Sequence, residues 1–313
     1  MANVLLKLLL LIALRPLAGQ PITAGPPKLE AENVFAGEGP SWDPAGWLYF
    51  TGRGRISRRD AAGRISTFRE AAGGANGTLV DPQGRLIVCE PVARRVTRTE
   101  RDGSLTVLTD HYQGKRYNSP NDLTIDSRGR IYFSDPRYGD RTGMEMPEAV
   151  YRIDAPGQVV RILETEVDRP NGLLVTPDDR YLYVADNNNN KVGGARKLWR
   201  FDLLPNGTVR ASSGKLIFDW GSARGPDGVK IDRRGRLFVA AGRNQPRPPY
   251  ETTEKYRGGI FILSPEGKLL EFVPIPQDEV TNCTFGGPDL KTLFITAGGS
   301  LWSVPLKESG WRR

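Results

Sequence analysis

The chain has 313 residues, a formal net charge of +8 at pH 7, two cysteines and a single histidine. One histidine excludes zinc sites built from several histidines, and two cysteines do not make a disulfide framework. The arginines stand in scattered pairs at turns, so the positive charge does not indicate a nucleic-acid-binding stripe. Cys89 and Cys283 adjoin apolar segments, and we expect both to be buried free thiols.

Residues 1–19 differ in composition from the rest of the chain. The apolar run Leu8–Leu14 follows Lys7, and small residues end the stretch at Gly19. This pattern is typical of a secretory signal peptide, and it is too short and too interrupted by basic residues for a stable membrane span. We therefore expect export, to the periplasm or the medium, and a single domain over residues 20–313.

A repeat runs through the remainder of the chain. A polar residue is followed, ten positions later, by an apolar triplet, and a turn sequence stands midway between them. The third copy shows the pattern with Asn121, the turn Asp126-Ser-Arg-Gly129 and the triplet Ile131-Tyr-Phe133. The six leading residues are Glu38, Asn76, Asn121, Asn171, Asp227 and Asn282.

Each copy predicts a short strand, a tight turn and a second strand, because Asp, Pro and Gly favour chain reversals. A second hairpin follows in most copies, as in residues 150–160 and 260–270. Successive leading residues lie 38 to 56 positions apart, which suits propeller blades. We predict an all-β fold, a six-bladed β-propeller with four-stranded blades. An irregular β-sandwich is the alternative, but it would not require a sixfold register.

The repeat also predicts a functional site. If the leading residues are equivalent, they begin the innermost strands and surround one mouth of the central channel. Carboxylate and amide oxygens favour a hard cation, and flexible geometry favours Ca²⁺ over Mg²⁺. The alternative is that these residues only cap strands and bond backbone amides. The sequence contains no nucleophile elbow or phosphate loop, and we interpret His111 as a loop residue without a catalytic role.

Six short segments carry the most distinctive residues of the chain. They are Gly37-Glu-Gly-Pro-Ser-Trp42, Asn118-Ser-Pro-Asn-Asp-Leu123, Ser134-Asp-Pro-Arg-Tyr-Gly139, Arg169-Pro-Asn-Gly-Leu173, Gly225-Pro-Asp-Gly-Val229 and Thr281-Asn-Cys-Thr-Phe-Gly-Gly-Pro-Asp-Leu290. Taken in order, they resemble the gluconolactonase, regucalcin (senescence marker protein) and luciferin-regenerating-enzyme family. The resemblance implies a six-bladed propeller with one catalytic divalent metal ion, usually calcium, in the central channel.

The resemblance also implies roles for individual residues. The metal-binding glutamate matches Glu38, the Asn-Gly asparagine matches Asn171, and the Pro-Asp-Gly aspartate, also the implied acid/base, matches Asp227. Asn121 matches an asparagine that binds metal or substrate. Animal members carry a substrate-contacting arginine where this chain has Ser119, so the chain is more similar to the bacterial gluconolactonase branch. The candidates for substrate binding are Asn121, Asp122, Ser119, Asn76 and Asn282.

These features predict a hydrolase of carboxylic ester bonds, a metal-dependent lactonase that opens a sugar lactone such as gluconolactone to the aldonic acid. The metal ion would polarise the carbonyl and Asp227 would deprotonate a water; direct attack by the Asp227 carboxylate is the alternative. One divalent cation is expected, Ca²⁺ first, with Mg²⁺, Mn²⁺ and Zn²⁺ as alternatives. The expected partner is a small-molecule lactone and not a nucleic acid, and the oligomeric state is not predicted.

Two other functions stay open at this stage. One is an organophosphate or aryl-ester hydrolase of the diisopropyl-fluorophosphatase type, which uses a similar calcium ring. The other is a non-enzymatic propeller that serves as a binding module. The shape of the pocket would separate them, and we expect it to depend on loops 111–120, 137–148 and 243–257. Three loop tyrosines could stack on a sugar, although loop tyrosines as often serve in packing: Tyr138, Tyr250 and Tyr256.

Overall fold

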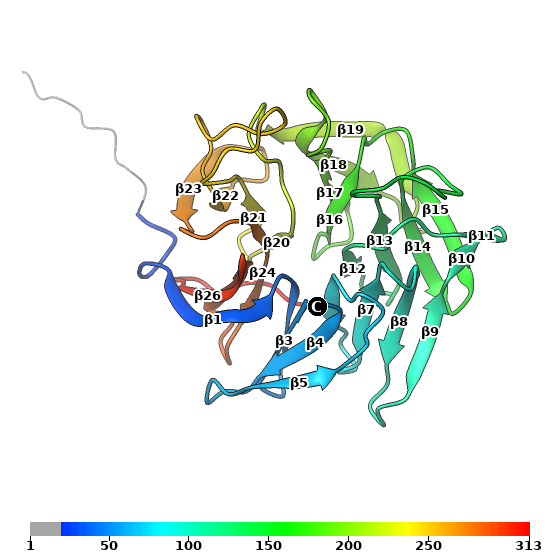
Figure 1. Cartoon of the computed structure of the whole chain (residues 1–313), viewed down its shortest axis with the longest axis horizontal. Helices are drawn as coiled ribbons and strands as arrows, with labels where there is room; N and C mark the ends of the chain where they lie inside the picture. The colour runs from blue at the N-terminus through cyan, green and yellow to red at the C-terminus, as the bar shows by residue number, and fades with distance from the viewer. Residues whose placement is uncertain (1–19) are drawn as a thin grey trace, which may run out of the picture.

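The computed structural model describes residues 20–313, which form six four-stranded antiparallel sheets around a central channel (Figure 1). The prediction of an all-β, six-bladed β-propeller is confirmed. The predicted signal peptide, residues 1–19, lies outside the described residues. Residues 20–313 contain no helix with the length and apolar character that a membrane crossing requires.

The strands of the first five blades follow one another outward from the channel in chain order. Blade one contains β2 (Glu38–Asp43), β3 (Trp47–Gly52), β4 (Arg55–Arg59) and β5 (Ile65–Arg69). Blade two contains β6 (Thr78–Val80), β7 (Leu86–Glu90), β8 (Arg95–Thr99) and β9 (Leu105–Thr109). Blade three contains β12 (Leu123–Ile125), β13 (Ile131–Asp135), β14 (Ala149–Ala155) and β15 (Gln158–Leu163).

The later blades repeat this order with one exception. Blade four contains β16 (Pro170–Val175), β17 (Tyr181–Asn187), β18 (Arg196–Leu203) and β19 (Val209–Asp219). Blade five contains β20 (Val229–Ile231), β21 (Leu237–Ala241), β22 (Gly259–Leu263) and β23 (Leu269–Pro274). Blade six contains β24 (Val280–Gly286), β25 (Thr292–Ala297), β26 (Gly299–Pro305) and, as its outer strand, β1 (Lys28–Ala36). A small hairpin, β10 (His111–Tyr112) and β11 (Lys115–Arg116), stands between blades two and three.

The ring is closed in two ways. The inner strands β2, β6, β12, β16, β20 and β24 each contact the next, and β24 returns to β2. At the rim, β1 pairs with β26, from Lys28 opposite Ser303 to Ala36 opposite Gly299. This pairing joins the beginning of the described chain to its last blade, an arrangement that protects sheet edges. The sequence pattern had left the residues of β1 unassigned.

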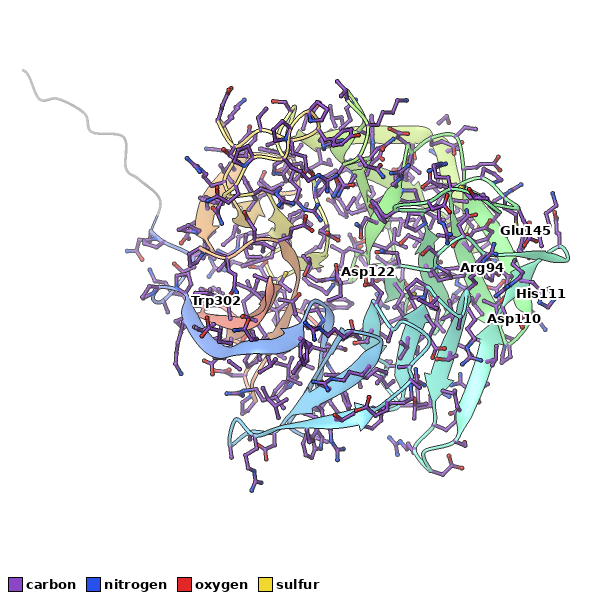
Figure 2. The ribbon with its side chains drawn as sticks, viewed as in Figure 1. Arg94, Asp110, His111, Asp122, Glu145 and Trp302 are labelled. Atoms are coloured by element: carbon purple, nitrogen blue, oxygen red, sulfur yellow. The ribbon has the colours of Figure 1, made fainter. Side chains whose placement is uncertain are left out.

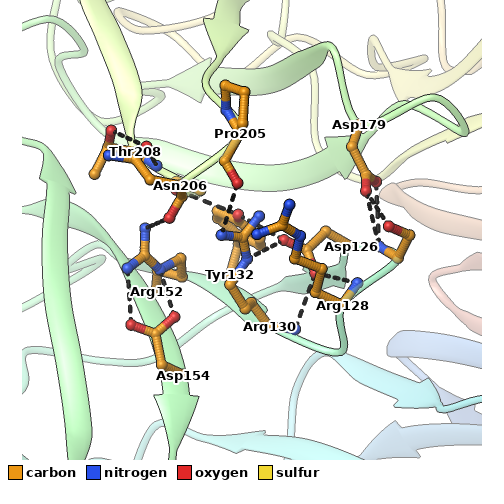
Figure 3. A network of polar contacts seen from close by, with 12 residues as sticks. Asp126, Arg128, Arg130, Tyr132, Arg152, Asp154, Asp179, Pro205, Asn206 and Thr208 are labelled. Atoms are coloured by element: carbon orange, nitrogen blue, oxygen red, sulfur yellow. Dashed lines mark hydrogen bonds and ion pairs between the residues drawn. The ribbon is translucent and has the colours of Figure 1, made fainter.

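The turn aspartates explain why a similar short sequence recurs between the first and second strands of a blade. Asp126 accepts hydrogen bonds through Oδ1 from the backbone N–H groups two and four residues further on, at 2.9 and 3.0 Å (Figure 3). Its Oδ2 accepts one from the Tyr132 hydroxyl at 2.9 Å. These bonds satisfy the backbone of a tight reversal, which is the usual role of Asp in turns. The same backbone contacts occur at Asp81 and Asp232.

The apolar side chains form six clusters, one between each pair of neighbouring blades. Between blades three and four, for example, Tyr132 and Val150 pack with Leu173 and Val184. Burial of these faces against each other is the main force that holds blade to blade. The cysteines confirm the prediction of buried free thiols, since Cys89 and Cys283 lie in different clusters.

Residues 310–313 cross the channel at the mouth where the inner strands end. The backbone N–H of Trp311 donates to the carbonyl of Ile231 at 3.1 Å, and Arg313 pairs with Asp179 at 2.7 Å. Figure 1 places this part of the chain at the centre of the ring. Trp311 thereby closes a small cavity of about 80 Å³ between the inner strands. The opposite mouth, where the leading residues lie, is the open one.

Candidate functional site

Five of the six leading residues meet in one cavity of about 470 Å³ at the mouth where the inner strands begin. They are Glu38, Asn76, Asn121, Asn171 and Asp227. The remaining wall consists of Tyr138, Gly139, Asn189, Asn190, Arg224, Arg247, Glu279 and Thr281. The equal offset in the sequence therefore corresponds to equivalent places around the channel.

A glycine directly follows four of the leading residues, and the narrow channel requires it. A Cβ at Gly172 would lie 2.1 Å from the carbonyl oxygen of Asp227, in the next blade. Equivalent approaches occur at Gly39 toward Asn76 O at 2.1 Å, at Gly77 toward Asn121 O at 2.5 Å, and at Gly228 toward Asn282 Oδ1 at 2.0 Å. Each glycine thus makes room for the leading residue of the following blade, so the ring side chains can converge.

Three ring oxygens are buried without a hydrogen-bond donor among the described residues: Oδ1 of Asn121, Asn171 and Asp227. A buried acceptor left unpaired costs about 1–3 kcal/mol, so three around one cavity require an explanation. Within residues 20–313 no group of three His, Cys, Asp or Glu side chains could hold a metal ion. The ring instead offers two carboxylates, of Glu38 and Asp227, and amide oxygens. This oxygen-only set fits a hard divalent cation.

The electrostatic surroundings of Glu38 also fit a bound cation. Its side chain is half-buried, and Oε2 accepts hydrogen bonds from Gly39 N at 3.1 Å and from Asn282 Nδ2 at 3.2 Å. Burial raises the pKa of Glu38 well above its usual range, and the carboxylates of Asp227 and Asp122 raise it further. Carboxylates held close together in a buried place are costly to ionise unless a cation neutralises them.

Asp227 is held by an arginine that the sequence did not indicate. Arg224 Nη2 lies 2.8 Å from Asp227 Oδ2, which leaves Oδ1 as the unpaired oxygen. Arg224 also lies 3.3 Å from Glu279 and 3.7 Å from Glu251. Burial raises the pKa of Asp227 to about 7, against the opposing effect of the Arg224 guanidinium. Arg224 therefore fixes one carboxylate oxygen while the other stays available.

Tyr138 fixes the amide of Asn171. Its hydroxyl accepts a hydrogen bond from Asn171 Nδ2 at 3.0 Å and donates one to the carbonyl of Asn187 at 3.1 Å. With the nitrogen engaged in this way, Oδ1 of Asn171 is the atom left for a ligand. Tyr138 is one of the three tyrosines that could stack on a sugar, and the structure gives its hydroxyl a positioning role.

Three predicted substrate-binding residues do not line the cavity. Asp122 and Asn282 are buried near the axis and hydrogen-bond to each other at 3.3 Å; Figure 2 shows Asp122 at the centre of the ring. Ser119 is half-buried, and its backbone N–H donates to Asp135 Oδ1 at 2.6 Å. His111 lies at the outer edge of the ring beside Asp110, far from the cavity (Figure 2).

Two of the three loops that we expected to shape the pocket contribute residues to the cavity wall. Loop 137–148 contributes Tyr138 and Gly139, and loop 243–257 contributes Arg247, whereas residues 111–120 do not reach the cavity wall. Tyr250 and Tyr256 do not line it either; Tyr256 packs on Phe218 and Phe261.

Several lining residues were missed by the sequence interpretation. Asn189 and Asn190 belong to a run of four asparagines, Asn187–Asn190, which is a signal that could have marked the loop. Arg224, Glu279 and Thr281 lie close in the sequence to leading residues, Arg224 three positions before Asp227 and Thr281 directly before Asn282, but none of them holds a repeat position that would have marked it.

Comparison with known proteins agrees with this geometry. Residues 36–299 match the sequence profile of the SMP-30/Gluconolactonase/LRE-like region. A gluconolactonase of Zymomonas mobilis is 33% identical over 256 residues, which cover 78% of this chain and 65% of that protein. The structure of a gluconolactonase from Xanthomonas campestris is 30% identical with a TM-score of 0.75, over 90% of this chain and 89% of that chain. The calcium-binding protein regucalcin of Agrobacterium tumefaciens shares the fold at 17% identity, with a TM-score of 0.67 over 90% of this chain and 95% of that chain.

The chain spans less than two thirds of the length of the first curated relatives it matches, from 47% to 65%. The family match nevertheless covers all six inner strands and the whole ring of leading residues. The chain therefore belongs to the SMP-30/gluconolactonase/LRE-like family.

Proposed function

We propose that this protein is a divalent-cation-dependent lactonase that hydrolyses a sugar lactone to the aldonic acid, with Ca²⁺ as the favoured ion. The observation that carries the proposal is the set of three buried, unpaired oxygens of Asn121, Asn171 and Asp227 beside Glu38. These four residues would hold the cation. When bound, it would polarise the lactone carbonyl and stabilise the charge that develops on its oxygen.

We assign the proton transfer to Asp227. Arg224 engages its Oδ2, so Oδ1, which would also contact the cation, is the oxygen left to accept the proton of a water that attacks the lactone carbonyl. The carbon–oxygen bond of the ring then breaks, and the proton passes to the departing ring oxygen, which becomes the hydroxyl of the open acid. Direct attack by the Asp227 carboxylate on the lactone carbonyl is the alternative route; the ring oxygen would leave, and the mixed anhydride formed on Asp227 would then be hydrolysed by water.

The wall of the cavity favours a lactone over an aryl ester or a phosphotriester. Asn76, Asn189, Asn190 and Thr281 offer hydrogen-bonding groups suited to sugar hydroxyls. Among the described lining residues Tyr138 is the one aromatic side chain, and its hydroxyl is engaged with Asn171. A site for aryl groups would instead be predominantly apolar and aromatic.

Exhaustive chelation is expected to abolish hydrolysis, and Ca²⁺ is expected to restore it best. The test is a panel of sugar lactones, aryl esters and organophosphates, each assayed with Ca²⁺, Mg²⁺, Mn²⁺ and Zn²⁺ added to the chelated protein. Sugar lactones should be the preferred class. Full activity in the chelated protein would refute the cation-dependent mechanism, and preference for a phosphotriester would move the assignment to the alternative hydrolase.

Tyr138→Phe is expected to weaken Ca²⁺ binding roughly 10-fold, at the lower end of the effect of residues that orient metal ligands. The substitution removes the hydroxyl that fixes the Asn171 amide but keeps the ring and its packing. Calorimetric titration of the chelated protein measures the effect. Tyr250→Phe, at a tyrosine outside the cavity wall, is the matched control. Equal affinities in the wild type and Tyr138→Phe would show that Asn171 needs no such support.

A further inference from the structure

Asn282 connects two opposite sides of the channel. It lies on the inner strand of blade six, and Asp122 directly precedes the inner strand of blade three; both are nearly fully buried. Asn282 Nδ2 is 3.2 Å from Glu38 Oε2 and 3.3 Å from Asp122 Oδ2. Because the third and sixth blades face each other in a ring of six, this amide spans the channel and touches a predicted cation ligand.

The orientation of the amide is set by its surroundings. Oδ1 of Asn282 accepts the backbone N–H of Cys283 at 2.9 Å and lies 3.5 Å from Lys230 Nζ. A flipped amide would set its oxygen against two carboxylates and its nitrogen against these donors. Gly228 provides the space, because a Cβ there would lie 2.0 Å from Asn282 Oδ1. The NH₂ group is therefore directed at Glu38 and Asp122.

We infer that Asn282 is a positioning residue for Glu38, which it holds by Oε2 so that Oε1 is left for the cation, and that it is not a substrate contact. The inference rests on the proposed function, because it assumes that the ring binds a divalent cation. Two observations support it: Asn282 is absent from the cavity wall, and no described residue donates a hydrogen bond to Oε1 of Glu38. The amide also separates two carboxylates that would otherwise face each other unshielded.

In this arrangement Asp122 has a structural role, as an acceptor of hydrogen bonds. Asp122 Oδ1 accepts the backbone N–H of Leu123 at 2.8 Å, so its Oδ2 is the atom that meets Asn282. The residue directly after a leading residue is glycine in four blades; the two exceptions are Asp122 and Cys283. The Asp122 side chain fills the axis where glycines elsewhere leave room.

Asn282→Ala is expected to weaken Ca²⁺ binding roughly 10- to 100-fold, the usual effect of losing a residue that orients a metal ligand. Calorimetry on the chelated protein without substrate gives the affinity, and kinetics at saturating Ca²⁺ give the KM for the lactone, which the loss of a substrate contact would raise and the loss of a positioning residue would not. Cys283→Ala is the matched control. Its side chain is buried in the apolar cluster between blades five and six, so this substitution should lower stability and leave Ca²⁺ affinity unchanged.

The outcomes separate the two levels of the proposal. If wild-type protein binds no divalent cation, the proposed function fails. If the wild type binds Ca²⁺ and Asn282→Ala binds it equally well while KM for the lactone rises, Asn282 is a substrate contact and this inference is wrong. Asn282→Ser, which is too short to reach Glu38 but stays polar, carries the same test if the alanine variant does not fold; normal Ca²⁺ affinity there would overturn the inference equally.

Discussion

Asp227→Asn is expected to lower kcat for lactone hydrolysis by roughly 10²- to 10⁴-fold, the usual contribution of a general acid or base. The variant should fold, because an amide has the same shape and its oxygen can still accept the hydrogen bond that Arg224 donates at 2.8 Å. Its NH₂ group would then face the unpaired oxygens of Asn121 and Asn171, where it offers neither a base nor a negative charge.

The measurement is steady-state kinetics at saturating Ca²⁺, with Ca²⁺ affinity determined separately by calorimetry, so that a lost ligand and a lost base are distinguished. Turnover should fall more than substrate binding weakens. Asp232→Asn is the control in the same blade, since Asp232 stabilises a turn outside the cavity and its loss should affect stability and not kcat. Near-native kcat in Asp227→Asn would refute the proposed role. Single turnover of the wild type in ¹⁸O-water tests the direct route, because label in the Asp227 carboxylate can come only from water that hydrolyses an anhydride formed on Asp227.

Gly172→Ala should destabilise the protein by about 3 kcal/mol or more, at the upper end of the cost of overpacking. The added Cβ would lie 2.1 Å from Asp227 O and 3.0 Å from the Cα of Gly228, so backbone of the neighbouring blade would have to move. The φ angle of Gly172 is not positive, so the cost comes from lack of space and not from an unsuitable conformation. Because Asp227 itself is displaced, activity should fall together with stability.

Denaturant unfolding of the two proteins measures this difference. Gly37→Ala is the matched control: Gly37 precedes the leading residue Glu38, also lacks a positive φ, and a Cβ there would meet nothing closer than 3.6 Å. It should change the unfolding free energy by less than about 1 kcal/mol. Similar stability in both variants would mean that the inner strands can separate without cost, contrary to the close approach described above.

The repeat predicted the blades correctly because its elements are local. The turn at Asp126 forms from hydrogen bonds within five residues, and the apolar triplets follow from strand alternation, so both are visible along the sequence. The outer strand β1 was not predicted, because its partner β26 lies more than 260 positions away. Pairing at that distance leaves no local pattern.

The candidate site also combines features that are visible in the sequence with features that depend on the fold. The sequence by itself determined the ring of oxygen-bearing residues, because an equal offset in every repeat becomes an equal position in every blade: Glu38, Asn121, Asn171 and Asp227 share one cavity. Only the tertiary structure decided which atoms of that ring are available. Arg224 and Asn282 engage one carboxylate oxygen of Asp227 and of Glu38, and Tyr138 engages the amide nitrogen of Asn171, so one oxygen of each ring residue stays unbound. Tyr138 and Asn282 make these contacts from a neighbouring blade, whereas Arg224 stands three residues before Asp227. Side-chain contacts between blades depend on how the sheets pack around the axis, and a repeat period cannot specify that packing.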